Sequence, residues 1–285
     1  MVDVDLGVAG LNAKATLGPA DTVRLARLAE ELGYGSWWAG DHVVLPSPRV
    51  PDSPMEATDP IVDPLVHLGF VAAVTERIEL ATGIVILPQR SPLVLAKQAA
   101  SLDVLSGGRL ALGVGAGYLE PEFAAVGVPL ARRGARSDEY LDAMTALWTQ
   151  PAPEFHGEFV SFDHVDAYPR PVRDGGVKIV VGGHSAGALR RAVSRGHGWF
   201  GNGSGAADLE RALAGLRRAA AEVERPARLG RLEINWMQLD PVELTAADAR
   251  RYAELGVDRH VVYPLPLEDA AEVADLLKRH ADLRG

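Results

Sequence analysis

The chain has 285 residues, a length that suits one α/β barrel or two smaller domains. It carries 29 Lys and Arg against 38 Asp and Glu, a net charge of −9, which argues against general nucleic-acid binding. Cysteine is absent, so disulfides, thiolate metal sites and cysteine nucleophiles are excluded. The sequence shows neither a signal peptide nor an apolar stretch of membrane-spanning length. We therefore expect one cytoplasmic domain, residues 1–285, with no membrane or nucleic-acid partner.

Apolar runs and amphipathic stretches alternate along the chain. The apolar runs predict strands at 4–9, 36–39, 78–87, 109–115, 178–181, 197–200, 232–238 and 259–263. Helical spacing predicts helices at 21–32, from 63 onward, and at 92–105, 135–149, 186–195, 206–224, 246–255 and 268–280. Eight strands, each followed by a helix, predict an α/β fold, a (β/α)8 TIM barrel.

The clearest unit is the βαβ segment 75–118, in which two apolar runs flank one helix. The helix begins after Ser91, with Pro92 in its first turn, and ends at a glycine pair. A βαβ unit implies parallel strands, and ligands of such folds bind at the carboxyl ends of the strands. The small residues at 82–83 and 113–117 indicate that a flat or bulky ligand lies against the backbone there.

Two long irregular insertions, 46–60 and 118–134, follow the second and fourth predicted strands. The first is either a functional lid or a disordered tip. Both lie at the C-terminal rim, where the active sites of such barrels are built. Segment 155–162 alternates apolar and polar residues and predicts a small antiparallel hairpin outside the barrel.

The turn Gly182-Gly183-His184-Ser185 leads from a predicted strand directly into a helix. Glycines let backbone N–H groups approach an anion, and a helix N-terminus favours negative charge. The turn is therefore either a phosphate cradle or a tight connection with a serine N-cap. Arg190 and Arg191, which follow in the helix, are interpreted as surface charges.

Asp41 and His42 end the second strand at the rim. A histidine there suits general acid–base chemistry or a hydrogen bond to a polar ring edge, although structural polar residues also close strands. Glu120 and Glu122, in the loop after the fourth strand, could face the substrate, but we interpret them as solvated loop charges or helix N-terminal residues. Adjacent Trp37 and Trp38 are expected to point to opposite faces of their strand.

Several catalytic classes lack their motifs. The eight histidines show neither HisXHis nor HisGluXXHis spacing, so no metal site is expected. No GlyXSerXGly nucleophile elbow occurs, and 113–118 lacks the third glycine and the helix of a dinucleotide-binding turn.

Four stretches carry a family resemblance: ELGYGSWWAGDH (31–42), TERIELATGIVILP (75–88), KQAASLDVLSGGRLALGVGAGY (97–118) and GGHSAGALRRA (182–192). They resemble the bacterial-luciferase-like flavin and deazaflavin oxidoreductases, and are most similar to the actinobacterial branch that uses coenzyme F420. The resemblance implies a barrel that binds a flat tricyclic ring at its mouth. It also implies that two barrels pair as a dimer.

The resemblance assigns roles residue by residue. The positions that it implies for the cofactor are Asp41 and His42 beside the ring, Gly83 and Ile84 as a non-prolyl cis peptide behind it, Ala116 and Gly117 near the ribityl chain, and Gly182, Gly183, His184 and Ser185 around the phosphate. The family's sugar-phosphate dehydrogenases have a catalytic glutamate where this chain has Tyr118, so that reaction is not expected.

These features together predict an F420-dependent oxidoreductase that transfers hydride between the ring and a small organic substrate with an activated C=C or C=O bond. His42 is the candidate proton donor or ring partner, and the loops 46–60 and 118–134 are expected to set the substrate. An FMN-dependent monooxygenase on the same scaffold is the first alternative. A flavin- or deazaflavin-binding protein without turnover is the second.

Overall fold

The computed structural model describes residues 4–239, 244–264 and 269–281. Their central feature is a closed barrel in the order β3-β2-β1-β11-β10-β9-β8-β5, which closes where β3 pairs with β5. Its strands are β1 (Asp5–Ala9), β2 (Ser36–Ala39), β3 (Glu79–Thr82), β5 (Leu110–Gly115), β8 (Lys178–Gly182), β9 (Gly198–Gly203), β10 (Glu233–Gln238) and β11 (Arg259–Val262). Every neighbouring pair is parallel, so the predicted (β/α)8 TIM barrel is confirmed.

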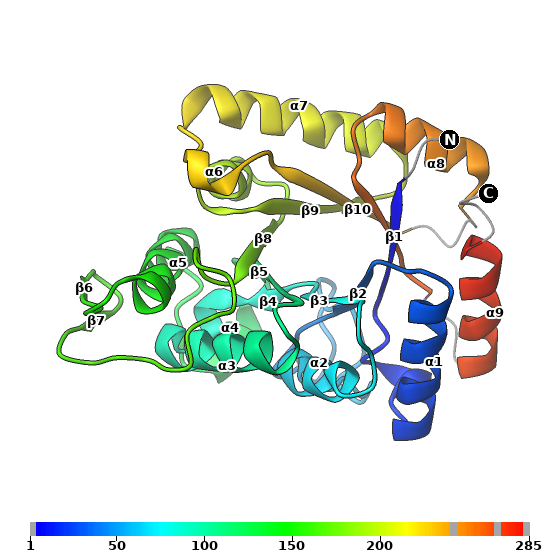
Figure 1. The fold of residues 1–285 in the computed structure, drawn as a ribbon, viewed down its shortest axis with the longest axis horizontal. Coiled ribbons are helices and arrows are strands. Elements are labelled where there is room, and N and C mark those ends of the chain that lie inside the picture. Colours follow the sequence, from blue (N-terminus) through cyan, green and yellow to red (C-terminus); the bar gives the residue numbers. More distant parts are fainter. Residues whose placement is uncertain (1–3, 240–243, 265–268, 282–285) are drawn as a thin grey trace.

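Helices form an outer layer around the barrel (Figure 1). They are α1 (Pro19–Glu31), α2 (Pro64–Ala72), α3 (Pro92–Leu105), α4 (Glu120–Ala125), α5 (Arg133–Thr149), α6 (Ala186–Arg195), α7 (Ala206–Glu222), α8 (Ala246–Glu254) and α9 (Ala270–Ala281). Asp63 caps α2 by accepting hydrogen bonds from the N–H groups of Leu65 and Val66 at 2.9 and 3.1 Å. Within the described ranges, no helix has the length and apolar character needed to cross a bilayer.

The prediction of a single strand at 78–87 is wrong, because this stretch forms two short strands separated by a break. After β3, a non-proline cis peptide bond joins Gly83 to Ile84, the pair that the family resemblance indicated. The second piece, β4 (Val85–Ile86), then pairs with the end of β5. The break places Ile84 at the mouth of the barrel instead of within a continuous strand.

The irregular insertion predicted at 118–134 is also partly wrong, since it contains the short helix α4. The predicted hairpin is confirmed as the antiparallel strands β6 (Phe155–His156) and β7 (Ser161–Phe162). It lies beside α5, where Glu139 accepts hydrogen bonds from three consecutive amides of the hairpin turn at 2.9, 2.6 and 2.7 Å. The hairpin therefore belongs to the outer layer, as expected.

The tryptophans of β2 point to opposite sides of the strand, as predicted. Trp37 donates from Nε1 to His67 of α2 at 3.0 Å, in the layer between barrel and helices. Trp38 lies inside the barrel and stacks on Phe200, with ring centroids 4.7 Å apart. The interior cluster consists of Ala9, Trp38, Ala81, Ala111, Val180, Phe200, Met237 and Val261. The barrel thus has a packed centre that supports the residues at its mouth.

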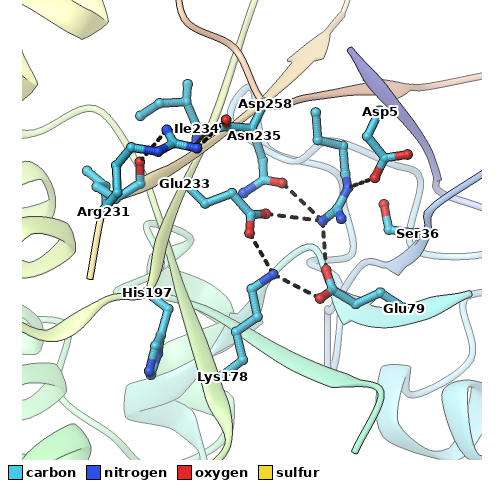
Figure 2. Close-up of polar contacts among 12 residues, drawn as sticks. Asp5, Ser36, Glu79, Lys178, His197, Arg231, Glu233, Ile234, Asn235 and Asp258 are labelled. Atoms are coloured by element: carbon cyan, nitrogen blue, oxygen red, sulfur yellow. Dashed lines mark hydrogen bonds and ion pairs between the residues drawn. The ribbon is translucent and has the colours of Figure 1, made fainter. Parts of the chain in front are cut away.

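Charged side chains from the first positions of five strands close the opposite end (Figure 2). Lys178 Nζ contacts Glu79 and Glu233 at 2.8 and 2.7 Å. Arg259 reaches the same two carboxylates at 2.6 and 3.2 Å, and Asp5 at 2.8 Å. Burial raises the pKa of Glu79, but the two cations outweigh burial and hold it below its ordinary value. Ion pairs therefore connect these five strands at the end of the barrel where the strands begin.

Candidate functional site

A cavity of about 660 Å³ opens at the carboxyl ends of the barrel strands, within the size range of cofactor sites. All ten predicted site residues line it: Asp41, His42, Gly83, Ile84, Ala116, Gly117, Gly182, Gly183, His184 and Ser185. They come from the ends of β2, β5 and β8 and from the bulge between β3 and β4. The structure thus brings residues from distant parts of the chain to one place.

His42 stands at the cavity wall and is held from behind by Glu122 of α4. Its Nδ1 lies 3.1 Å from Glu122 Oε2, and the N–H of Val43 donates to Glu122 Oε1 at 2.7 Å. Burial raises the pKa of Glu122, but its contacts with His42 and the N–H of Val43 outweigh burial and lower it. Because an ionised carboxylate only accepts hydrogen bonds, this contact favours the tautomer of His42 that carries its proton on Nδ1.

Of the two interpretations of Glu122, the helix N-terminal residue is confirmed and the solvated loop charge is wrong. Its side chain is 0% exposed, whereas Glu120, one residue before Pro121, is exposed as expected. Both residues lie in the first turn of α4, and the neighbouring Phe123 is buried as well. The helix turns one acidic residue to solvent and the other toward His42.

Asp41 lines the cavity but uses its carboxylate on neighbouring protein groups. Oδ2 accepts a hydrogen bond from the N–H of Ile86 at 3.0 Å, and Oδ1 accepts one from Arg90 Nη2 at 2.7 Å. Arg90 also reaches Asp63, the cap of α2, at 2.8 Å. Asp41 therefore fixes the backbone just after the Gly83–Ile84 bulge.

Two glycines of β5 are required by the bulge. A Cβ at Gly113 would lie 1.8 Å from the carbonyl oxygen of Thr82, and one at Gly115 would lie 1.8 Å from Ile84 Cδ1. Small residues at these positions were expected to make room for a ligand. At these two sites they make room for the protein's own bulge, which in turn lines the cavity.

One end of the cavity suits an anion. Ser185 caps α6, accepting a hydrogen bond from the N–H of Ala188 at 3.2 Å, which leaves its hydroxyl proton available. Gly183 has φ +113°, a conformation that side chains rarely adopt. The turn therefore contains the serine N-cap that one prediction required. It also has the glycine and the helix N-terminus that the prediction of a phosphate cradle required.

Arginines missed by the sequence reasoning lie beside this turn. Arg191 is only 5% exposed, bonds Asp138 at 2.7 Å and lines the cavity, so its interpretation as a surface charge is wrong. Arg190 is exposed and pairs with Glu222, as a surface charge would. Arg133 lines the cavity, donates to the carbonyl of Gly117 at 2.9 Å and pairs with no carboxylate of the described residues.

The remaining wall is mostly apolar. Met55, Ile61, Met237 and Leu239 line it, together with Tyr263, whose pKa is raised by burial. Most of these side chains present no hydrogen-bonding group, so this part of the cavity suits an apolar molecule. No cluster of three or more metal-ligating side chains occurs among the described residues.

The family follows from a comparison with known sequences. A model of the luciferase-like monooxygenase family matches residues 5–284. The chain belongs to this family, whose members are oxidoreductases and monooxygenases.

Individual relatives differ in the cofactor that their names give. The chain is 34% identical over 265 residues to an uncharacterised protein of Mycobacterium tuberculosis (strain ATCC 25618 / H37Rv), covering 90% of this chain and 91% of that one. It is 33% identical over 162 residues, 55% of this chain and 44% of the relative, to an FMNH2-dependent dimethylsulfone monooxygenase of Pseudomonas putida. Among solved structures, an F420-dependent secondary alcohol dehydrogenase superimposes with a TM-score of 0.78 at 16% identity, over 99% of both chains. The last likeness concerns the fold alone.

Proposed function

We propose that this protein is a coenzyme F420-dependent oxidoreductase that transfers hydride between the deazaflavin ring and a small organic substrate with an activated C=C or C=O bond. The observation that carries the proposal is the polarity of one cavity. The 182–185 turn, Arg133 and His42 all line it, and other lining residues are apolar. This arrangement fits a ligand with an anionic tail and a flat ring, beside an uncharged substrate.

When bound, the deazaflavin supplies the hydride chemistry at C5 of its ring, and the protein supplies binding, orientation and a proton. Backbone N–H groups at the start of α6 and the Ser185 hydroxyl would hold the phosphate, together with His184. The backbone at Ala116 and Gly117 would contact the ribityl chain. The bulge at 83–84, held by Asp41, would contact the ring.

His42 is the proposed proton donor. Its Nε2 exchanges a proton with the substrate atom next to the one that receives hydride. His42→Ala is expected to keep the affinity for the cofactor within about threefold and to lower turnover by roughly 10²- to 10⁴-fold, the usual contribution of a general acid. Equilibrium titration and steady-state rates measure both, and unchanged turnover would make His42 structural.

The positive charge of Arg133 on the cavity wall favours F420 over FMN. F420 continues beyond its phosphodiester into carboxylates, whereas FMN ends at its phosphate. Arg133 lines the cavity and is a cation without a carboxylate partner among the described residues, whereas the neighbouring Arg132 is paired with Glu158. An additional anionic group on the cofactor would meet complementary charge here.

The decisive experiment is a side-by-side fluorescence or calorimetric titration of the purified protein with F420 and FMN. Tight binding of F420 alone supports the proposal. A preference for FMN supports the alternative, a flavin monooxygenase, which the Pseudomonas putida relative favours. Binding without substrate-dependent reoxidation, tested with a panel of enones, supports a non-catalytic binding protein.

We also propose that two barrels pair through α2 and α3. Both helices carry exposed apolar side chains, including Val66 (69% exposed), Phe70 (44%), Val94 (57%) and Leu105 (81%). Apolar side chains on the outer faces of neighbouring helices are typical of an interface. Sedimentation velocity measures the state directly, and a monomer at micromolar concentration would contradict the pairing.

A further inference from the structure

We propose that Glu122 is a positioning residue that fixes the tautomer of His42, so that Nε2, the nitrogen facing the cavity, exchanges the proton with the substrate. This inference rests on the proposed function, because it concerns how His42 works in the same reaction. Glu122 itself is not among the residues that line the cavity. It therefore acts through His42.

Both oxygens of Glu122 are held in place. Oε1 accepts the N–H of Val43 at 2.7 Å, and Oε2 lies 3.1 Å from His42 Nδ1. The Glu122 side chain is fully buried, while the His42 side chain keeps 12% of its surface exposed. The two ring nitrogens lie on different edges of the imidazole. Since Nδ1 is turned to the buried carboxylate, Nε2 points the other way and bonds no described residue.

The other charged or titratable groups near His42 leave this assignment intact. Asp41, the preceding residue, is paired with Arg90. Tyr118 contacts the His42 ring edge-on, with centroids 6.4 Å apart. Burial, Glu122 and Asp52 all raise the pKa of the Tyr118 phenol, so it stays neutral. Among the described residues, Glu122 is the carboxylate that reaches the ring.

A fixed tautomer has a direct chemical consequence. With Nδ1–H bound to Glu122, the neutral ring presents a lone pair at Nε2, and the protonated ring presents an N–H there. In a reduction, Nε2 of the imidazolium would give its proton to the substrate and leave a neutral imidazole, while the bound cofactor would supply the hydride. The ring need not rotate, and solvent returns the proton. The opposite tautomer could not take a proton at Nε2.

Glu122→Gln tests the proposal without changing the side-chain shape. The N–H of Val43 requires an acceptor, so the amide oxygen takes the Oε1 place and the NH2 group faces His42 Nδ1. That NH2 group donates to Nδ1, and the neutral ring must then carry its proton on Nε2. We expect ¹⁵N NMR above neutral pH to show Nδ1–H in the unmodified protein and Nε2–H in the variant. The His42→Ala spectrum identifies the signals.

The kinetic readout is separate from the spectroscopic one. Turnover of the variant is expected to fall by about 100-fold or more, with the cofactor Kd changed less than about twofold. Glu120→Gln is the matched control, because it removes an exposed carboxylate from the same turn of α4, and it should change neither readout.

Three results would overturn the proposal. They are an Nε2–H tautomer in the unmodified protein, an unchanged tautomer in Glu122→Gln, and a switched tautomer with unchanged turnover. The first result is measured on the unmodified protein, so the proposal can be refuted even if Glu122→Gln does not fold. Failure of the proposed function looks different: neither F420 nor FMN binds or turns over, while the NMR spectra still report how Glu122 holds His42.

Discussion

His67 makes the stability of the barrel depend on pH. Its side chain is buried in α2, stacks on Trp37 with centroids 5.9 Å apart, and accepts a hydrogen bond from Trp37 Nε1 at 3.0 Å. Because Nε2 accepts this bond, the ring is neutral in the folded protein. Burial accordingly lowers the pKa of His67 from 6.5 to about 4.

The sign and size of the effect follow from proton linkage. Between pH 6.5 and 4 the unfolded chain binds the proton and the folded chain does not, so stability falls as the pH falls through this window. At pH 5 the pH is about 1.5 units below the pKa of His67 in the unfolded chain. Each unit of this difference lowers the unfolding free energy by about 1.4 kcal/mol. His67 should therefore cost about 2 kcal/mol of unfolding free energy at pH 5 relative to pH 7.5.

His67→Gln removes the titration and keeps an acceptor for Trp37. Urea unfolding at pH 7.5 and pH 5 measures the two free energies for each protein. The unmodified protein should lose about 2 kcal/mol more than the variant, while exposed His156→Gln should behave like the unmodified protein. His197, with a pKa of about 4, titrates equally in all three proteins and cancels. Equal losses in His67→Gln and the unmodified protein would refute the reasoning.

Two further predictions concern the ends of the barrel. Gly183→Asp combined with Ser185→Ala should abolish tight binding of a phosphorylated cofactor, because it places a carboxylate at the cradle, and calorimetric titration that still finds tight binding would place the phosphate elsewhere. Lys178→Met should lower the unfolding free energy by about 2 kcal/mol, because it removes a cation that the partly buried Glu79 and Glu233 share. Denaturant unfolding measures the loss, and a change below about 1 kcal/mol would show that Arg259 alone satisfies both carboxylates.

The sequence was most informative where local rules decide the structure. Asp63 followed by proline begins α2, and glycine ends other helices, so most boundaries were predicted to within two residues. The site residues were predictable because barrel chemistry collects at strand ends, and 41–42 and 182–185 lie there. The end of the helix predicted at 268–280 is at Ala281, while residue 268 lies outside the described ranges.

Long-range pairing explains the misses. Glu122 and Arg191 are buried although they are charged residues near a helix start and within a helix, where charged side chains are usually exposed. Their partners, His42 and Asp138, lie 80 and 53 positions away. Phe123 was the available signal, since a large apolar residue after Glu122 suggests a helix that packs inward. Sequence spacing cannot say which of two neighbouring acids faces the core.

The polar groups at the mouth divide into those that hold the protein together and those left for a ligand. The Asp41 carboxylate is occupied by Arg90 and the bulge, and Arg191 by Asp138. His42 Nε2 and the guanidinium of Arg133 remain without acidic partners among the described residues. Both residues are only partly buried and line the cavity, so their polar groups are accessible to a ligand there. Under the proposed function, His42 would exchange a proton with the substrate and Arg133 would bind an anionic group of the cofactor.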